Sequence, residues 1–128
     1  MLPRFSVLIV DPLEETHEVL RTALEPQGVR IYATGEPALG ARLMRQHVPD
    51  LIVLDAEHLA ASPQSVADDF AAQSRARSTP LLLIGGTLRQ GKVATAGEMV
   101  RKPYHYGPLI RKIEELLAAY QQPVARAA

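Results

Sequence analysis

The sequence contains no cysteine and no tryptophan. Without cysteine the chain can form no disulfide, bind no metal through thiolates and use no cysteine nucleophile, and this composition suits a reducing compartment. The apolar runs, such as VLIV near the start, are too short for the core of a signal peptide or for a membrane span. We therefore expect a cytoplasmic protein that has no contact with a membrane.

An excess of one charge is also missing. Fourteen Lys and Arg residues balance fourteen Asp and Glu residues, so we expect no broad basic surface and no direct binding to nucleic acid. The chain does have 128 residues, of which 47% are hydrophobic and 22% are charged, as is typical of one compact domain. We expect residues 1–120 to form that domain and residues 121–128 to form a tail or linker.

Short apolar runs alternate with longer amphipathic segments along the chain. Continuous apolar runs at residues 6–10, 51–54 and 81–84 are typical of buried strands, and the alternating residues 29–33 are typical of a strand nearer an edge. Apolar residues at helical spacing predict helices at residues 13–24, 37–46, 63–74 and 108–120. This alternation predicts a parallel sheet with helices on both faces.

Three charged residues follow predicted strands. Asp11 comes after the first strand, Asp55 after the strand at 51–54, and Lys102 after a short run at residues 99–101. Because the carboxyl ends of parallel strands meet at one edge, these side chains are expected to converge there. Two carboxylates and an ammonium group suit Mg²⁺ and a phosphate. Asp11 and Pro12 also fit a structural role, as the N-cap and first residue of the next helix.

The order of these motifs resembles the receiver domain of two-component response regulators. VLIVD, PDLIVLD, PLLLI and RKPY, followed by the last helix, carry the resemblance from residue 6 to about residue 120. It implies a flavodoxin-like, doubly wound sheet of five parallel strands in the order 2-1-3-4-5. It further implies that Asp55 is the phosphoacceptor, that Asp11 is an acid that binds Mg²⁺ and that Lys102 contacts the phosphoryl group.

Two residues depart from the pattern of that family. Pro12 stands where receivers usually have a second acid, so Mg²⁺ should bind weakly, with partial replacement by Glu57 or by an acid in the first turn of the next helix. Gly85 stands where receivers usually have Thr or Ser. The segment from Gly85 to Lys102 is also shorter than usual by about one helical turn, which predicts a short or melted fourth helix.

Two functions remain open at this point. In the first, the chain takes a phosphoryl group from a histidine kinase or phosphotransfer protein and changes its affinity for a downstream protein. In the second, it is a pseudo-receiver, an interaction module that is independent of phosphate. The face near Tyr104 and Tyr106 is expected to contact a partner or a second copy of the chain. Enzyme activity beyond self-phosphorylation and slow dephosphorylation is not expected.

One further motif nearly matches a phosphate-binding P-loop. In IGGTLRQGKV, Gly86, Gly91 and Lys92 have the required spacing, but Val93 replaces the Ser or Thr that would hold Mg²⁺. Too little helix follows to direct its N-terminus at phosphates. We interpret the glycines as a flexible loop instead.

Overall fold

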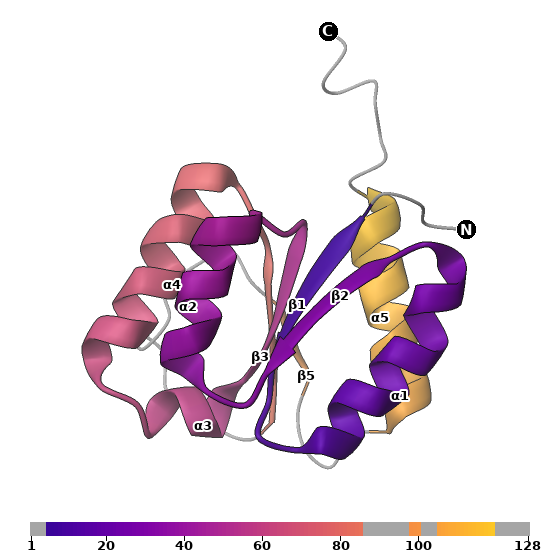
Figure 1. Cartoon of the computed structure of the whole chain (residues 1–128), viewed down its shortest axis with the longest axis horizontal. Coiled ribbons are helices and arrows are strands. Elements are labelled where there is room, and N and C mark those ends of the chain that lie inside the picture. The colour runs from indigo at the N-terminus through magenta and orange to yellow at the C-terminus, as the bar shows by residue number, and fades with distance from the viewer. Residues whose placement is uncertain (1–4, 86–97, 101–104, 120–128) are drawn as a thin grey trace, which may run out of the picture.

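The computed structural model describes residues 5–85, 98–100 and 105–119, which form a parallel sheet between two layers of helices (Figure 1). The strands are β1 (Ser6–Val10), β2 (Arg30–Thr34), β3 (Leu51–Asp55), β4 (Leu81–Ile84) and β5 (Glu98–Val100). All neighbouring pairs are parallel, in the order β2-β1-β3-β4-β5. This confirms the predicted order of the strands and the position of β2 at an edge.

The described residues form a helix at each of the four predicted segments, with small shifts at the ends, and two further short helical elements that were not predicted. They are α1 (Glu14–Leu24), the 3-10 turn η1 (Glu25–Gln27), α2 (Pro37–His47), α3 (Ala56–Ala60), α4 (Gln64–Arg77) and α5 (Tyr106–Ala119). In Figure 1, α1 and α5 cover one face of the sheet, and α2 and α4 cover the other. No helix in the described ranges is long and apolar enough to cross a membrane. The short or melted helix expected between β4 and β5 falls on residues 86–97, outside the described part of the chain.

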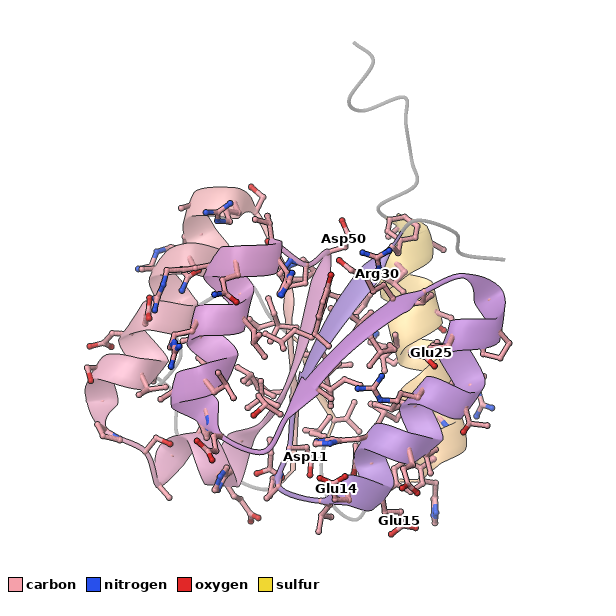
Figure 2. All side chains as sticks on the ribbon, in the orientation of Figure 1. Asp11, Glu14, Glu15, Glu25, Arg30 and Asp50 are labelled. Atoms are coloured by element: carbon pink, nitrogen blue, oxygen red, sulfur yellow. The ribbon has the colours of Figure 1, made fainter. Side chains whose placement is uncertain are left out.

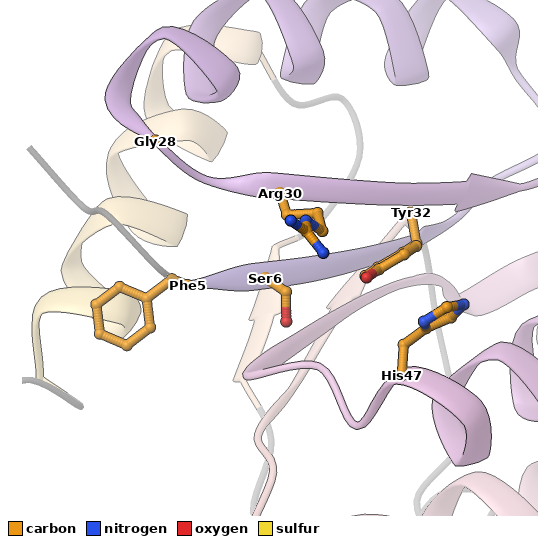
Figure 3. A pocket seen from close by; sticks show the side chains of 6 residues that line it. All are labelled: Phe5, Ser6, Gly28, Arg30, Tyr32 and His47. Atoms are coloured by element: carbon orange, nitrogen blue, oxygen red, sulfur yellow. The ribbon is translucent and has the colours of Figure 1, made fainter.

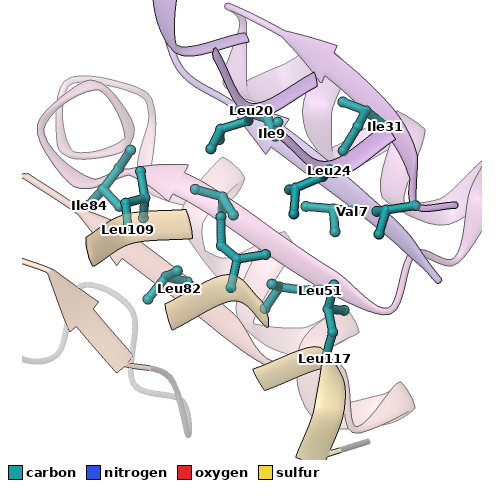
Figure 4. Packing of buried hydrophobic residues seen from close by; sticks show 13 residues of the cluster. Val7, Ile9, Leu20, Leu24, Ile31, Leu51, Leu82, Ile84, Leu109 and Leu117 are labelled. Atoms are coloured by element: carbon teal, nitrogen blue, oxygen red, sulfur yellow. The ribbon is translucent and has the colours of Figure 1, made fainter. Parts of the chain in front are cut away.

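The core has two halves because successive strand residues point to opposite faces of the sheet. Val7 and Ile9 of β1 pack on the α1 and α5 side, whereas Leu8 and Val10 pack on the α2 and α4 side. Figure 4 shows the first half, in which Leu20 and Leu24 of α1 and Leu109 and Leu117 of α5 meet the sheet. Ile113 of α5 belongs to the same cluster. Burial on both faces explains why these strands are continuously apolar in the sequence.

The beginning of α1 differs from the prediction. The predicted helix at residues 13–24 begins with Leu13 as one of its apolar residues, but Leu13 precedes the helix in an extended conformation and is 52% exposed. The positions that continue the buried face of Leu20 and Leu24 are instead occupied by Thr16 and His17. Because Leu13 lies outside the helix, its spacing from Leu20 no longer determines which way it points.

Gly40 allows α2 to lie unusually close to β1. A Cβ atom at this position would lie 2.6 Å from Val10 Cγ2 and 3.2 Å from Phe70 Cζ. Both distances are shorter than ordinary van der Waals contacts between carbons. The lack of a side chain at Gly40 therefore lets α2 pack directly on Val10, the residue before Asp11.

Candidate functional site

Asp11 and Asp55 lie at neighbouring positions on the carboxyl edge of the sheet. In the register of β1 and β3, Val10 lies beside Leu54, and the two aspartates are the next residues along the chain. Asp11 is 0% exposed and Asp55 is 5% exposed. The fold therefore brings two predicted site residues to the same edge and buries both.

Three hydrogen bonds hold the turn at Asp11. Its backbone N–H donates to the Thr34 carbonyl at 3.0 Å, and its Oδ1 accepts the N–H of Leu13 at 2.7 Å. The Asp11 carbonyl accepts a hydrogen bond of 2.7 Å from His17 Nε2. The expectation that Asp11 caps α1 and that Pro12 is its first residue is wrong, since Leu13 is the N-cap and α1 begins at Glu14. The carboxylate closes a tighter turn two residues long instead.

Two buried polar residues of α1 support this edge. His17 is 7% exposed, and its Nδ1 lies 3.9 Å from Glu14 Oε2 on the surface. Thr16 is 0% exposed, and its Oγ1 lies 3.1 Å from Tyr106 Oη in the first turn of α5. Sequence reasoning missed both roles. The available signal was that Thr16 and His17 precede Leu20 at helical spacing, so polar groups had to be buried there.

Asp55 caps the short helix α3. Its Oδ1 accepts the N–H of His58 at 2.8 Å, which satisfies a donor in the first turn of that helix. No helix was predicted between the strand at 51–54 and the helix at 63–74, so α3 is an element that the structure adds. α3 forms directly after β3 because the Asp55 side chain caps its first turn.

The predicted metal residues are only partly brought together. Glu57 lies in α3 with an exposed side chain, whereas Asp11 and Asp55 are buried. Among the residues that the structure describes, no three His, Cys, Asp or Glu side chains form a group that could hold a metal ion. Two carboxylates still suit Mg²⁺ when a phosphate supplies further oxygen ligands.

Two other acids lie near this edge. Glu14 and Glu15 are exposed in the first turn of α1, and Figure 2 shows both at the same end of the molecule as Asp11. Like Glu57, they are exposed, whereas the two aspartates are buried. Glu14 lies 3.9 Å from His17 Nδ1, but exposure leaves the carboxylates of Glu14 and Glu15 less fixed by the fold than those of the two aspartates.

Gly85 directly follows β4 at the same edge. It is buried, has a positive φ of 101° and donates its N–H to the Val100 carbonyl at 2.9 Å. A left-handed conformation favours glycine over Thr or Ser. Lys102 and Tyr104 lie outside the described residues, as do the P-loop-like residues that follow Gly85, so their roles stay predictions.

The architecture can be compared with known proteins. No protein-family model matches the sequence, and no curated protein matches it significantly. The signal receiver domain of a LuxO repressor protein from Vibrio parahaemolyticus is 15% identical, with a TM-score of 0.74 over 98% of each chain. The chain has the receiver-domain fold. This confirms the predicted fold class.

Other receiver structures agree. The receiver domain of a sensor histidine kinase from Pseudomonas aeruginosa is 18% identical, with a TM-score of 0.69 over 89% of this chain and 98% of that one, and it has a magnesium ion in its active-site cleft. The chemotaxis response regulator CheY4 of Vibrio cholerae is 16% identical, with a TM-score of 0.71 over 88% and 98%. The receiver fold is thus shared with both kinases and regulators.

Proposed function

We propose that this receiver-fold chain is a signalling module that accepts a phosphoryl group on Asp55 from a histidine kinase or phosphotransfer protein. The observation that carries the proposal is the register of β1 and β3, which puts Asp55 beside Asp11 at the carboxyl edge. In open α/β sheets, ligands bind at this edge. The proposal includes a cytoplasmic location, which the lack of cysteine suits.

In the proposed reaction, a carboxylate oxygen of Asp55 forms a bond to phosphorus while the bond from phosphorus to the donor nitrogen breaks. The donor imidazole leaves and takes up a proton from solvent. Oδ1 of Asp55 accepts the N–H of His58 at 2.8 Å. That hydrogen bond fixes the orientation of the carboxylate before the donor arrives.

Asp11 and Asp55 are the residues that would hold Mg²⁺, with Glu57 as a third, weaker candidate. The ion would neutralise charge on the carboxylate and on the phosphoryl oxygens. The contribution of Asp11 depends on its own position, which Thr34, Leu13 and His17 fix through hydrogen bonds. Lys102, two residues after β5 in the sequence, is proposed as the cation that contacts the phosphoryl group.

The output is proposed to be a change in protein binding through the face near Tyr104 and Tyr106. Tyr106 is half-buried and lies in the first turn of α5, where Thr16 links it to α1. A rearrangement at the Asp11 turn would therefore reach α5 through adjacent residues of one helix. No activity on a small substrate is proposed.

The alternative is a pseudo-receiver that binds its partner without phosphorylation. Pro12 and Gly85 favour it, because they remove the second acid and the hydroxyl that the receiver pattern usually has. In that case Asp55 and Lys102 would simply form an ion pair, and Asp11 and Asp55 would order the turn after β1 and the start of α3.

Intact-mass spectrometry after incubation with Mg²⁺ and acetyl phosphate tests the proposal. We expect one phosphoryl group on the wild type and none on Asp55→Asn. Because an asparagine oxygen also accepts hydrogen bonds, this variant keeps the cap of α3 and is a matched control for folding. If the folded wild type gains no mass from acetyl phosphate or from a panel of histidine kinases, the pseudo-receiver is the correct reading.

A further inference from the structure

A pocket lies at the edge of the sheet opposite Asp11 and Asp55. Its volume is about 500 Å³, within the range of sites for small molecules. It is lined by Phe5, Ser6, Gly28, Arg30, Tyr32 and His47. Figure 3 shows Arg30 and Tyr32 projecting from β2 toward the side where α2 ends at His47. The pocket thus forms where the amino ends of β1 and β2 extend past the last turn of α2.

The polar side chains of this pocket are mainly donors without protein partners. Within the described residues, the guanidinium of Arg30 makes no hydrogen bond or ion pair, and the same holds for Tyr32 Oη and the ring nitrogens of His47. Ser6 Oγ makes only a long contact of 3.4 Å with Asp50 Oδ2. Unpaired donors that converge on one pocket are suited to an anion.

No carboxylate is among the residues that line this pocket. The nearby Asp50 accepts the backbone N–H of Ser6 at 2.8 Å, so its Oδ2 is directed at the backbone of β1. The guanidinium can present two parallel N–H donors to one carboxylate or phosphate group. The charge in the pocket is therefore complementary to an oxyanion.

One wall of the pocket is aromatic. The rings of Tyr32 and His47 stack with their centroids 4.1 Å apart and their planes inclined by 16°. Such a pair offers a flat and rigid surface on which a planar group gains contact at little cost in side-chain entropy. The wall stands beside Arg30, which lies two residues before Tyr32 on the same strand face.

We propose that this pocket binds a small molecule that carries a phosphate or carboxylate group on a planar ring. Arg30 holds the anion, the Tyr32 hydroxyl donates to it, and the Tyr32–His47 pair contacts the ring. This site is separate from the carboxyl edge, and it does not depend on phosphorylation of Asp55.

The test is an NMR titration of the labelled full chain with phenyl phosphate, benzoate and inorganic phosphate. We expect saturable shifts at the amides of Ser6, Arg30 and Tyr32. Phenyl phosphate should bind about tenfold more tightly than inorganic phosphate, because only the former has a ring to stack. The comparison of phenyl phosphate with benzoate identifies which anion the pocket prefers.

Variants distinguish this site from general attraction of anions. Arg30→Gln should weaken phenyl phosphate binding about tenfold or more, and Tyr32→Phe should weaken it less, because the ring remains. Arg42→Gln is the matched control, since Arg42 is exposed on α2 and has no partner among the described residues. Equal weakening by both arginine variants, shifts confined to the carboxyl edge, or no saturable shift would each overturn the proposal.

Discussion

At the carboxyl edge of the sheet, Asp11 and Asp55 are buried, and each carboxylate accepts a backbone N–H from the residues that follow it. At the amino edge, Arg30 is exposed, and its guanidinium has no partner among the described residues. Folding itself fixes the carboxylates of Asp11 and Asp55, because burying a carboxylate without a hydrogen bond would cost free energy. The side chain at the second edge stays in water until a ligand binds. The two edges therefore differ in whether the protein or a ligand completes the polar contacts.

The largest effect that separates the two edges is expected from Asp55→Asn. This variant should lose all phosphoryl transfer, because an amide oxygen is not a competent nucleophile here. Binding of phenyl phosphate at the amino edge should be unchanged. Intact-mass spectrometry and the NMR titration, run on the same sample, measure both. A loss of binding at both edges would show that they are not independent.

Gly40→Ala should destabilise both edges together, since α2 runs from one to the other. The added Cβ meets Val10 and Phe70 at distances that require the helix to shift, so we expect a loss of about 3 kcal/mol in the free energy of unfolding. Urea denaturation measures it. Gly107→Ala is the control, because a Cβ there would come no closer than 3.6 Å to Arg111 and should leave stability equal or higher by up to about 1 kcal/mol.

His17→Leu should loosen the carboxyl edge alone. The buried carbonyl of Asp11 would lose its donor, which costs about 2 kcal/mol. Hydrogen exchange at the amide of Leu13 should accelerate, whereas the amide of Arg30, bonded to the Phe5 carbonyl, should not change beyond the global loss of stability. His17→Gln restores a donor and should recover part of the effect. Equal acceleration at both amides would contradict a local role for His17.

Pro12→Asp should sharpen the difference between the edges by adding a second acid beside Asp11. We expect Mg²⁺ to bind about tenfold more tightly, equivalent to about 1.4 kcal/mol. Isothermal titration calorimetry with MgCl₂ measures the change, and Pro12→Asn controls for the loss of proline without adding charge. Equal affinity in the wild type and Pro12→Asp would show that Pro12 is not a missing ligand position.

The smallest effect is expected for the contact between α1 and α5. Thr16→Val and Tyr106→Phe each remove one partner of the 3.1 Å hydrogen bond, and each should cost about 1 kcal/mol. The double variant should cost less than the sum of the two single variants, because both lose the same bond. Additive losses in urea denaturation would mean that the two hydroxyls do not interact.

Much of the fold could be predicted because the apolar pattern follows local geometry. The strands are recognisable from VLIV, LIVL and LLLI, since both faces of each are buried. The strand order came from the resemblance and is confirmed. The pairing of Asp11 with Asp55 at one edge was also predictable, because parallel strands end together. The roles of Lys102 and Tyr104 stay predictions.

Other features could not be predicted from spacing. The short helix α3 is capped by the side chain of Asp55. Over only five residues, the apolar pattern does not distinguish such a helix from a loop. The exposure of Leu13 depends on where α1 begins, and helix boundaries respond to single hydrogen bonds. The amino-edge pocket depends on where α2 stops relative to β2, a distance in space between segments that are separate in the sequence.

The sequence by itself determined the alternation of strands and helices and the positions of the acids at strand ends, because hydrophobic periodicity and chain direction act locally. Only the tertiary structure decided which polar groups are bonded and which are not. His17 meets the Asp11 carbonyl, and Thr16 meets Tyr106, because α1 packs against both the sheet and α5 and so buries these two residues. Arg30 has no such constraint, because its side chain is exposed.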